Sequence, residues 1–293
     1  MFNRNTNQRV WIRRLSRAMK IKLYGTAAAE GVPALFCNCR VCQNATKTGG
    51  KEIRTRSQSL INDSILIDFP GDTFLHKVYH GLSLNDLKHL VVTHSHHDHF
   101  FGEDLMMRMS GYGNDLEFPM NVYGNDVVKS MFERAQNLEG FTDEKRLTYT
   151  EIFEYEPLKL EDVTITPLLA DHALNEKCYI LDIEHDGKRI LYGHDTGFFP
   201  DSVWDFFKKQ NLRYDMVLLD CTHQDVRVKR NHMSFHDNIK VKDQMIALNY
   251  ADEMTQFVVT HFSHNGGYTH AETVEWADKN GFICAYDGIE FIF

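Results

Sequence analysis

The residues between Thr93 and His99 are the part of the chain best suited to metal chemistry. They read Thr-His-Ser-His-His-Asp-His and place His94, His96, Asp98 and His99 within six residues. Protonated imidazoles this close together would repel one another, and burying them unpaired would be costly, whereas a divalent metal makes such a cluster favourable. We therefore expect these side chains to bind metal.

Other candidate ligands follow predicted strands. The cluster itself comes directly after the apolar run 90–93, and three further apolar runs are each followed by an imidazole or a carboxylate. Loops at a sheet edge can aim a side chain while the strands stay rigid, so strand ends are common places for ligands. These further candidate ligands are His172, Asp195, His261 and His264.

The composition is that of an ordinary soluble protein. Of the 293 residues, 43% are hydrophobic and 25% are charged. No apolar stretch reaches the length of roughly 18 residues that a membrane span requires. The formal net charge of −9 argues against an extended nucleic-acid surface, because such surfaces need clustered Lys and Arg. We therefore expect neither a membrane nor a nucleic acid as a broad binding partner.

Residues 1–18 differ from the rest of the chain. They contain five arginines and no acidic residue, and they lack the apolar core of a secretion signal. We expect a disordered extension or a misassigned start, and we assign this segment no function. Residues 19–293 are expected to form a single domain, since no linker rich in Pro, Gly or Ser divides them. The expected location is the cytoplasm.

Short runs rich in β-branched residues alternate with amphipathic stretches. Strand patterns occur in both halves, and Asp186-Gly187 between two of them predicts a tight hairpin. Helical patterns fit residues 126–136, 202–210, 238–249 and 271–280. The last of these helices has Thr269 and Glu272 at capping-box spacing. This order predicts an α/β (α+β) fold in which two mixed β-sheets pack face to face, with helices on the outer faces.

The order His-x-His-x-Asp-His at residues 94–99 resembles the signature of the metallo-β-lactamase superfamily. The resemblance implies an αββα sandwich with two divalent metal ions, Mn²⁺ or Zn²⁺, in the active site. In that family each ion has its own ligands and one further residue bridges them. Carried over to this sequence, one ion takes His94, His96 and His172, the other takes Asp98, His99 and His261, and Asp195 bridges the two.

Two of these positions narrow the chemistry that the resemblance implies. An aspartate in the place of Asp195 is typical of the phosphodiesterase and glyoxalase II branches, whereas many true lactamases carry a cysteine near there. His96 stands where the redox-active di-iron relatives carry a glutamate. The resemblance therefore implies hydrolysis rather than electron transfer.

Three clustered cysteines, Cys37, Cys39 and Cys42, are one ligand short of a closed tetrahedral zinc site. Free or catalytic thiols are the alternative. The preceding residues 25–33, Gly-Thr-Ala-Ala-Ala-Glu-Gly-Val-Pro, are similar to the opening motif of the phosphoribosyl cyclic phosphodiesterases of the carbon–phosphorus lyase pathway. That resemblance implies a structural Zn²⁺ whose fourth ligand is His264.

Two later motifs, at residues 220–223 and 230–232, match the same family. They read Asp-Cys-Thr-His and Arg-Asn-His. The resemblance implies that His232, at the end of the second motif, is the general acid or base. Asp98 is the other residue that we expect to be catalytic, in addition to its place among the metal ligands.

Further positions bear on which substrate the protein binds. Arg108 stands where the family has an arginine after the metal loop and could contact a substrate phosphate, with a solvated helix residue as the alternative. The chain departs from the family at Ala27, where a glycine is usual, and in residues 103–157, which are longer and more acidic than expected. We expect this segment to border the substrate pocket.

The remaining histidines and cysteines are expected to be structural. A lone histidine is more often a core or surface residue than a ligand, and a buried thiol is usually inert. His97 and His194 stand beside ligands and are expected to support them or to be exposed. The structural set comprises His76, His80, His89, His185, Cys178, Cys221 and Cys284.

These observations predict a metal-dependent phosphodiesterase. Two metals would activate a hydroxide to attack a small phosphodiester, with a cyclic ribosyl phosphate as one candidate, and His232 would protonate the leaving group. The expected partner is a small phosphorylated substrate, and a homodimer is left open.

Three alternatives stay open. A transfer-RNA 3′-processing nuclease shares the histidine motif but uses a basic arm rich in Gly and Pro, which this sequence lacks. A glyoxalase II-like thioesterase shares the bridging aspartate but not the cysteine cluster. The pyrroloquinoline quinone biosynthesis B proteins have a similar cysteine cluster and provide a non-hydrolytic alternative.

Overall fold

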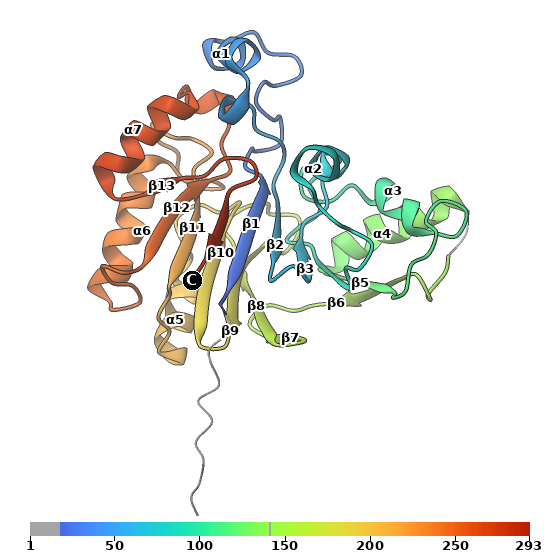
Figure 1. Ribbon diagram of the computed structural model, residues 1–293. Coiled ribbons are helices and arrows are strands. Elements are labelled where there is room, and N and C mark those ends of the chain that lie inside the picture. Colours follow the sequence, from blue (N-terminus) through green and yellow to red (C-terminus); the bar gives the residue numbers. More distant parts are fainter. Residues whose placement is uncertain (1–17, 141) are drawn as a thin grey trace, which may run out of the picture.

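Two β-sheets form the centre of the structure. The computed structural model describes residues 18–140 and 142–293. Within those residues, one seven-stranded sheet has the order β14-β1-β2-β3-β4-β5-β6 and the other has the order β13-β12-β11-β10-β9-β8-β7 (Figure 1). Our expectation of a disordered or misassigned start falls on residues 1–18, of which 1–17 lie outside the described residues.

The strands have two to seven residues each, a length common in globular proteins. The first sheet consists of β1 (Lys20–Gly25), β2 (Gln58–Ile61), β3 (Ile65–Ile67), β4 (His89–Val91), β5 (Met120–Gly124), β6 (Leu147–Glu151) and β14 (Glu290–Ile292). The second consists of β7 (Leu158–Leu160), β8 (Val163–Leu169), β9 (Tyr179–His185), β10 (Lys188–Gly193), β11 (Met216–Asp220), β12 (Gln256–Thr260) and β13 (Ile283–Cys284).

Both sheets contain parallel and antiparallel pairs. Strands β3 to β6 are parallel neighbours in the first sheet, and β10 to β13 are parallel neighbours in the second. The other pairs are antiparallel. In the β9–β10 hairpin His185 pairs with Lys188, so the tight turn predicted at Asp186-Gly187 is confirmed. Parallel neighbours bring their carboxyl ends to the same sheet edge. The candidate ligands come directly after such strand ends, so they lie at that edge.

Helices cover the outer faces of the two sheets. The second sheet carries α5 (Asp201–Gln210), α6 (Phe235–Ala247) and α7 (His270–Asn280) (Figure 1). The first sheet carries α2 (Thr73–His80), α3 (Gly102–Leu105) and α4 (Asp126–Glu139). The short 3-10 helix η2 (Met106–Arg108) directly follows α3. The segment with the cysteines continues into α1 (Arg40–Thr48) and η1 (Gly50–Glu52), and η3 (His264–Gly266) precedes α7. The αββα layering expected from the sequence is confirmed.

Strand β11 shows how one strand serves two hydrophobic layers. Met216 and Leu218 face the core between the sheets, whereas Val217 and Leu219 face the core under α5 to α7. Successive side chains of a strand point to opposite faces, so a strand covered on both sides must be apolar throughout. All five residues of β11 are buried accordingly. This rigid central layer holds the strand ends in place.

The four helices predicted from the sequence are present as α4 to α7 with ends shifted by up to three residues. The capping box at Thr269 and Glu272 is confirmed. Helix α2 was not predicted, because Phe74, Val78 and Tyr79 are exposed and its apolar pattern does not follow its buried side. Strands β2, β6, β7 and β13 and helices α1 and α3 were also missed. In the described part of the chain, no helix has the length and apolar character that crossing a bilayer demands.

Candidate metal centres and active site

The candidate ligands meet at one edge of the two sheets. Residues 94–99 follow β4, His172 follows β8, Asp195 follows β10 and His261 follows β12. Asp195 and His261 have φ angles of 47° and 59°, in the left-handed region that residues other than glycine seldom adopt. Such backbone conformations cluster at functional sites, where packing holds a side chain in a required direction.

The first ligand group consists of three imidazoles. His96 Nδ1 lies 2.9 Å from His94 Nε2 and 3.1 Å from His172 Nε2. Burial is the main reason that the pKa values of His94 and His172 are lowered, so both rings are neutral at neutral pH. Neutral imidazoles with converging nitrogens are the form that binds a divalent metal. His94 and His172 are buried, whereas His96 is on the solvent side.

The second group combines two carboxylates with two imidazoles. Asp98, His99, Asp195 and His261 are all buried, and their ligand atoms lie within 4.8 Å of one another. His99 Nε2 is 3.3 Å from Asp98 Oδ2, and His261 Nε2 is 3.2 Å from Asp195 Oδ2. Despite this proximity, His99 Nε2, His261 Nε2 and Asp195 Oδ2 have no hydrogen-bond partner. Buried polar atoms without partners are costly, and a cation among them would remove that cost. The residues therefore fit a divalent metal.

Asp195 lies between the two groups. Its Oδ1 atom is 3.8 Å from His172 Nε2, and its Oδ2 atom is 4.0 Å from His94 Nε2. Burial raises the pKa of Asp195, but His261 and His99 outweigh burial and lower it well below its usual range. An ionised carboxylate within 4 Å of nitrogens from both groups is in the position that a bridging ligand requires.

The ring nitrogens on the far side of the ligands are hydrogen-bonded to other residues. Such partners fix the tautomer and orientation of a ligating imidazole. The pairs are His99 Nδ1 with Asp68 Oδ2 at 2.7 Å, His94 Nδ1 with Thr93 Oγ1 at 3.1 Å, His172 Nδ1 with the Asn231 carbonyl at 3.0 Å and His261 Nδ1 with Thr222 Oγ1 at 2.9 Å.

Asp68 supports His99 and was not predicted from the sequence. This carboxylate is fully buried just after β3, with φ of 64°, and it also accepts hydrogen bonds from the Thr93 amide at 2.8 Å and hydroxyl at 3.0 Å. The available signal was an acidic residue directly after the apolar run Ile65–Ile67, where burial is expected and a charge needs a partner.

His232 lies beside the second group. Its Nδ1 atom is 2.8 Å from Asp220 Oδ2 and 3.4 Å from Asp195 Oδ1. Its ring lies 5.9 Å from that of His261 at an angle of 15°. Burial lowers the pKa of His232, but Asp220 outweighs burial and raises it to about 9. The imidazole therefore carries a proton near neutrality, although bound cations would act against that protonation.

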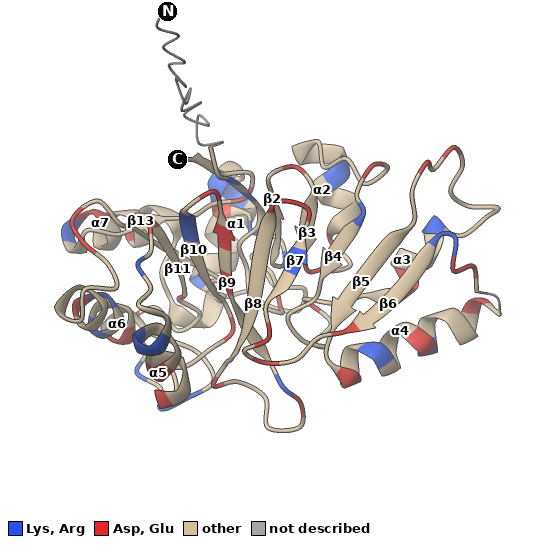
Figure 2. Ribbon diagram, turned by 90° about the horizontal axis from the view of Figure 1, so that it is seen from below, with Lys and Arg blue, Asp and Glu red and all other residues tan. Residues whose placement is uncertain are grey.

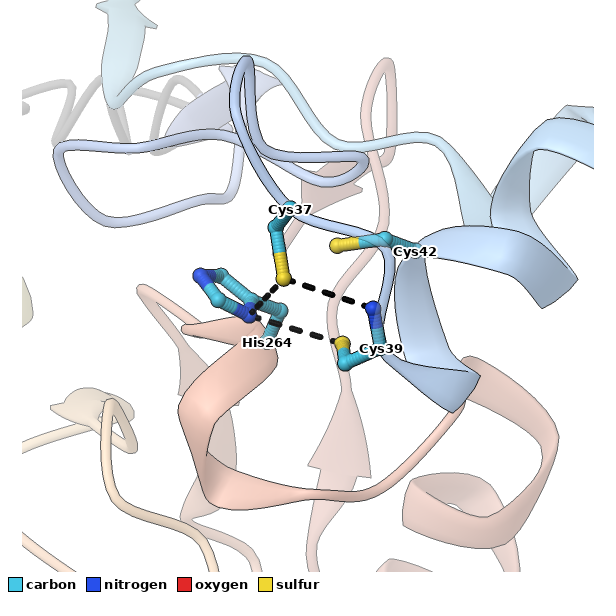
Figure 3. Close-up of side chains that lie close together, drawn as sticks. All are labelled: Cys37, Cys39, Cys42 and His264. Atoms are coloured by element: carbon cyan, nitrogen blue, oxygen red, sulfur yellow. Dashed lines mark hydrogen bonds between the residues drawn. The ribbon is translucent and has the colours of Figure 1, made fainter.

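Three cysteines and one histidine form a separate group at the start of α1. His264 Nδ1 is 3.4 Å from Cys37 Sγ and 3.6 Å from Cys39 Sγ (Figure 3). The Cys42 sulfur completes the group within 4.8 Å. Burial raises the pKa of Cys39, but the Cys42 amide and His264 outweigh it and lower the value to about 6. A thiolate among further sulfurs and an imidazole fits zinc.

Arg108 is held by the backbone of neighbouring loops, and its contact with a substrate phosphate stays a prediction. The side chain is buried, and its guanidinium donates to the backbone carbonyls of Phe118, Arg146 and Leu84. The alternative expectation of a solvated residue is wrong, because the side chain is buried. Each of its three guanidinium nitrogens donates to a carbonyl of a neighbouring loop, so the residue supports the packing of the segment that follows α3.

The remaining histidines and cysteines lie outside the metal-ligand groups found among the described residues. His194 is buried, stacks on Tyr192 with ring centroids 3.8 Å apart and lies 3.1 Å from Ser57 Oγ, whereas His97 is exposed. Cys178, Cys221 and Cys284 are buried, and burial raises the pKa of each thiol. These three cysteines are therefore protonated core residues, as expected.

Comparison with known families identifies the chain. A family described as the beta-lactamase superfamily domain matches residues 65–274, which is well over half of the sequence. The protein therefore belongs to the beta-lactamase superfamily. Its metal-ligand groups and its fold make it a hydrolase of the metallo-β-lactamase type.

Several solved structures share this fold. A diphosphatase from the PhnP family has a TM-score of 0.71 at 20% identity, with 94% of this chain and 97% of that chain covered. Zn²⁺-bound PqqB from Methylobacterium extorquens has a TM-score of 0.70 at 16% identity, covering 93% and 99%. The short form of human tRNase Z has a TM-score of 0.63 at 16% identity, covering 93% and 98%. At these identities the likeness shows the fold alone.

A curated protein shares a shorter stretch with this chain. It is an octanoyltransferase from Porphyromonas gingivalis, 33% identical over 90 residues. The match covers 29% of this chain and 17% of that protein. The chain thus spans less than a fifth of the curated relative that it matches.

Proposed function

We propose that the protein is a two-metal phosphodiesterase that acts on a small phosphodiester, with a cyclic ribosyl phosphate as the favoured candidate. The observation that carries this proposal is the position of His232, whose Nδ1 atom lies 2.8 Å from Asp220 and 3.4 Å from Asp195. A protonated imidazole held by a carboxylate beside the metal ligands is suited to donate a proton to a leaving group.

The ligand groups would hold two divalent metals. His94, His96 and His172 would hold one, and Asp98, His99 and His261 would hold the other, with Asp195 shared. When bound, two divalent metals supply Lewis-acid activation of water and neutralise charge that develops on a phosphoryl group. The histidine-rich ligand sets suit zinc or manganese, whereas the cysteine group favours a structural zinc because thiolates are soft ligands.

The presence of His232 as a proton donor favours a phosphodiester over a thioester as the substrate. An alkoxide is a strong base and leaves readily only if it receives a proton, whereas a thiolate is stable enough to leave without one. His232 Nδ1 lies 2.8 Å from Asp220 Oδ2, and this pairing favours the protonated imidazole against the opposing effect of burial, so His232 is suited to supply such a proton. A site built around this donor is therefore better matched to an oxygen ester.

Charge disfavours a long polynucleotide as the substrate. Acidic and basic residues are interleaved along α4 and α6 (Figure 2). The net charge of −9 would repel an extended phosphate backbone. A small anionic substrate needs only local attraction, which the metals would supply. We nevertheless include a precursor transfer RNA in the test, because a tRNase Z shares the fold.

The proposal is tested by a phosphorus NMR time course with protein loaded with manganese or zinc. The substrates are phosphoribosyl 1,2-cyclic phosphate and 2′,3′-cyclic AMP in one tube. Separate reactions contain a diphosphate ester, a precursor transfer RNA whose cleavage is followed on a gel, and a thioester whose hydrolysis is followed by the release of free thiol. Preferential opening of the ribosyl compound supports the proposal. Hydrolysis of the thioester alone, by protein whose metal content is complete, contradicts it and favours a glyoxalase II-like activity.

A further inference from the structure

Glu30 connects the opening loop with the segment that carries His264. Its Oε1 atom accepts hydrogen bonds from the Ser263 hydroxyl and from Asn265 Nδ2, the latter at 3.1 Å. The same oxygen lies 3.5 Å from His264 Nε2. One carboxylate oxygen therefore faces three consecutive residues at the start of η3.

Backbone pairing holds Glu30 in this position. The Ala28 amide donates to the Phe262 carbonyl at 2.9 Å, and the Phe262 amide donates to the Thr26 carbonyl at 2.9 Å. The chain then turns at Gly31, whose φ of 71° lies in the left-handed region and whose amide donates to the Ala28 carbonyl at 3.0 Å. Glu30 is thus presented from a turn whose neighbouring residues are paired with the segment that it contacts.

The two ring nitrogens of His264 face different partners. Nδ1 faces the sulfurs of Cys37 and Cys39 at 3.4 and 3.6 Å, and Nε2 faces Glu30. A neutral imidazole carries one proton, and an ionised carboxylate can only accept. A proton on Nε2 would therefore point to Glu30 and leave the lone pair of Nδ1 free for a metal.

We propose that Glu30 is a positioning residue for the group of three cysteines and His264, because it holds His264 in the tautomer whose Nδ1 atom can bind zinc. Pairs of carboxylate and histidine serve this purpose at many metal sites, and removing the carboxylate typically weakens metal binding about 10- to 100-fold. The inference rests on the proposal that this group holds zinc.

Glu30 also ties this group to the active site. Ser263, which donates to the Glu30 carboxylate, stands between His261 and His264 in the sequence. His261 belongs to the second ligand group, so the turn at Glu30 restrains a segment that contributes to both candidate metal centres. Loss of the carboxylate should consequently loosen the cysteine group first, because His264 is the ligand that it faces.

The test is made on the full-length protein with cobalt and zinc as probes. Cobalt bound by thiolates gives a charge-transfer band in the near ultraviolet, which ligands without sulfur do not give, so the band reports the cysteine group alone. Zinc affinity of this group is then measured by displacement of the cobalt band in the presence of a chelator. The variants are Glu30→Ala, Glu30→Gln and, as a matched control, Glu52→Ala. Glu52 is a carboxylate that accepts from the His270 amide at 2.8 Å at the start of α7.

The expected results differ for the three variants. Glu30→Ala should weaken zinc binding about 10- to 100-fold. Glu30→Gln should lose less, because its amide oxygen can still accept from Nε2. Glu52→Ala should bind zinc like the unaltered protein. Zinc affinity of Glu30→Ala within twofold of the unaltered protein overturns the proposal, as does an equal loss in Glu30→Ala and Glu52→Ala. If the unaltered protein shows no cobalt–thiolate band, the proposed zinc site fails together with this inference.

Discussion

The Nδ1 atom of His232 lies 2.8 Å from Oδ2 of Asp220, and Asp220 is itself held by the amides of Thr222 and Met233, each at 3.0 Å. This arrangement directs the imidazole from a buried carboxylate toward the metal ligands. Because Asp220 accepts bonds from the backbone of two segments, it restrains the orientation of His232 as well as its charge.

Replacing His232 with alanine should slow hydrolysis of a diester with an alkoxide leaving group by about 10²- to 10⁴-fold. A diester that releases p-nitrophenolate should be much less affected, since that leaving group does not need a proton. The measurement is kcat for both substrates at saturating metal. Equal losses on both substrates would show that His232 does not act as the acid.

Replacing Asp195 with alanine should remove metal from the histidine and aspartate centre. Its two carboxylate oxygens lie within 4 Å of nitrogens in both ligand groups, so both ions would lose a ligand at once. Metal analysis should show a lower content per chain, with the thiolate-bound metal retained. The control is His97→Ala, an exposed neighbour of the ligands, which should keep its full content. Unchanged metal content in the Asp195 variant would contradict the shared position.

Replacing Cys42 with serine should destabilise the whole fold. Structural zinc contributes roughly 10 kcal/mol of apparent folding free energy, and we expect a loss on the order of 5 kcal/mol when one of its four ligands is removed. Urea unfolding measures the difference. Cys178→Ala is the control, because this buried thiol lies outside the metal-ligand groups and should cost about 1 kcal/mol without loss of zinc. Equal destabilisation in the two variants would argue against a zinc at Cys42.

His76 should make stability depend on pH below neutrality. The ring is fully buried, with Nδ1 2.6 Å from Gln58 Oε1 and Nε2 2.7 Å from Thr55 Oγ1. Burial, with a smaller effect of His80, lowers the pKa of His76 from 6.5 to about 3. Between these values the unfolded chain binds a proton that the folded chain does not bind. This residue's contribution is therefore fully present above pH 6.5 and falls by about 1.4 kcal/mol for each pH unit below it.

The prediction for His76 is checked by urea unfolding at pH 7.5, 6 and 5 with free metal held constant. The unaltered protein should lose stability more steeply than His76→Gln as the pH falls, even though the variant is less stable at pH 7.5. Parallel profiles would mean that protonation of His76 does not contribute. The comparison of slopes removes the effect of other titrating groups, which both proteins share.

The clustering of the candidate ligands was predictable because its signals are local. Four of them stand within six residues at the end of one apolar run, and the side-chain types alone restrict what chemistry such a cluster can perform. The capping box of α7 was predictable for the same reason, since its two partners are three residues apart. Both predictions depend only on the separation of residues along the sequence, which is known before the chain folds.

Residues that support the ligands were harder to predict. Asp68 and Glu30 act on histidines 31 and more than 230 residues away in the sequence, so no local spacing relates them. Arg108 was misjudged because its partners are backbone carbonyls of segments that only folding brings together. Strand β13, with two residues, exists because β12 offers it a neighbour.

By itself, the sequence determined which residues could bind metal and which strands would carry them, because side-chain type and short-range periodicity are properties of the chain. Tertiary structure decided that Asp195 lies between both ligand groups and which ring nitrogen of each histidine faces inward. Those relations depend on the packing of two sheets whose ligand-bearing strands are separated by many residues. The core between the sheets fixes where these strands end, and so it sets the distances of 3.2 Å from His261 Nε2 and 3.8 Å from His172 Nε2 to the Asp195 carboxylate.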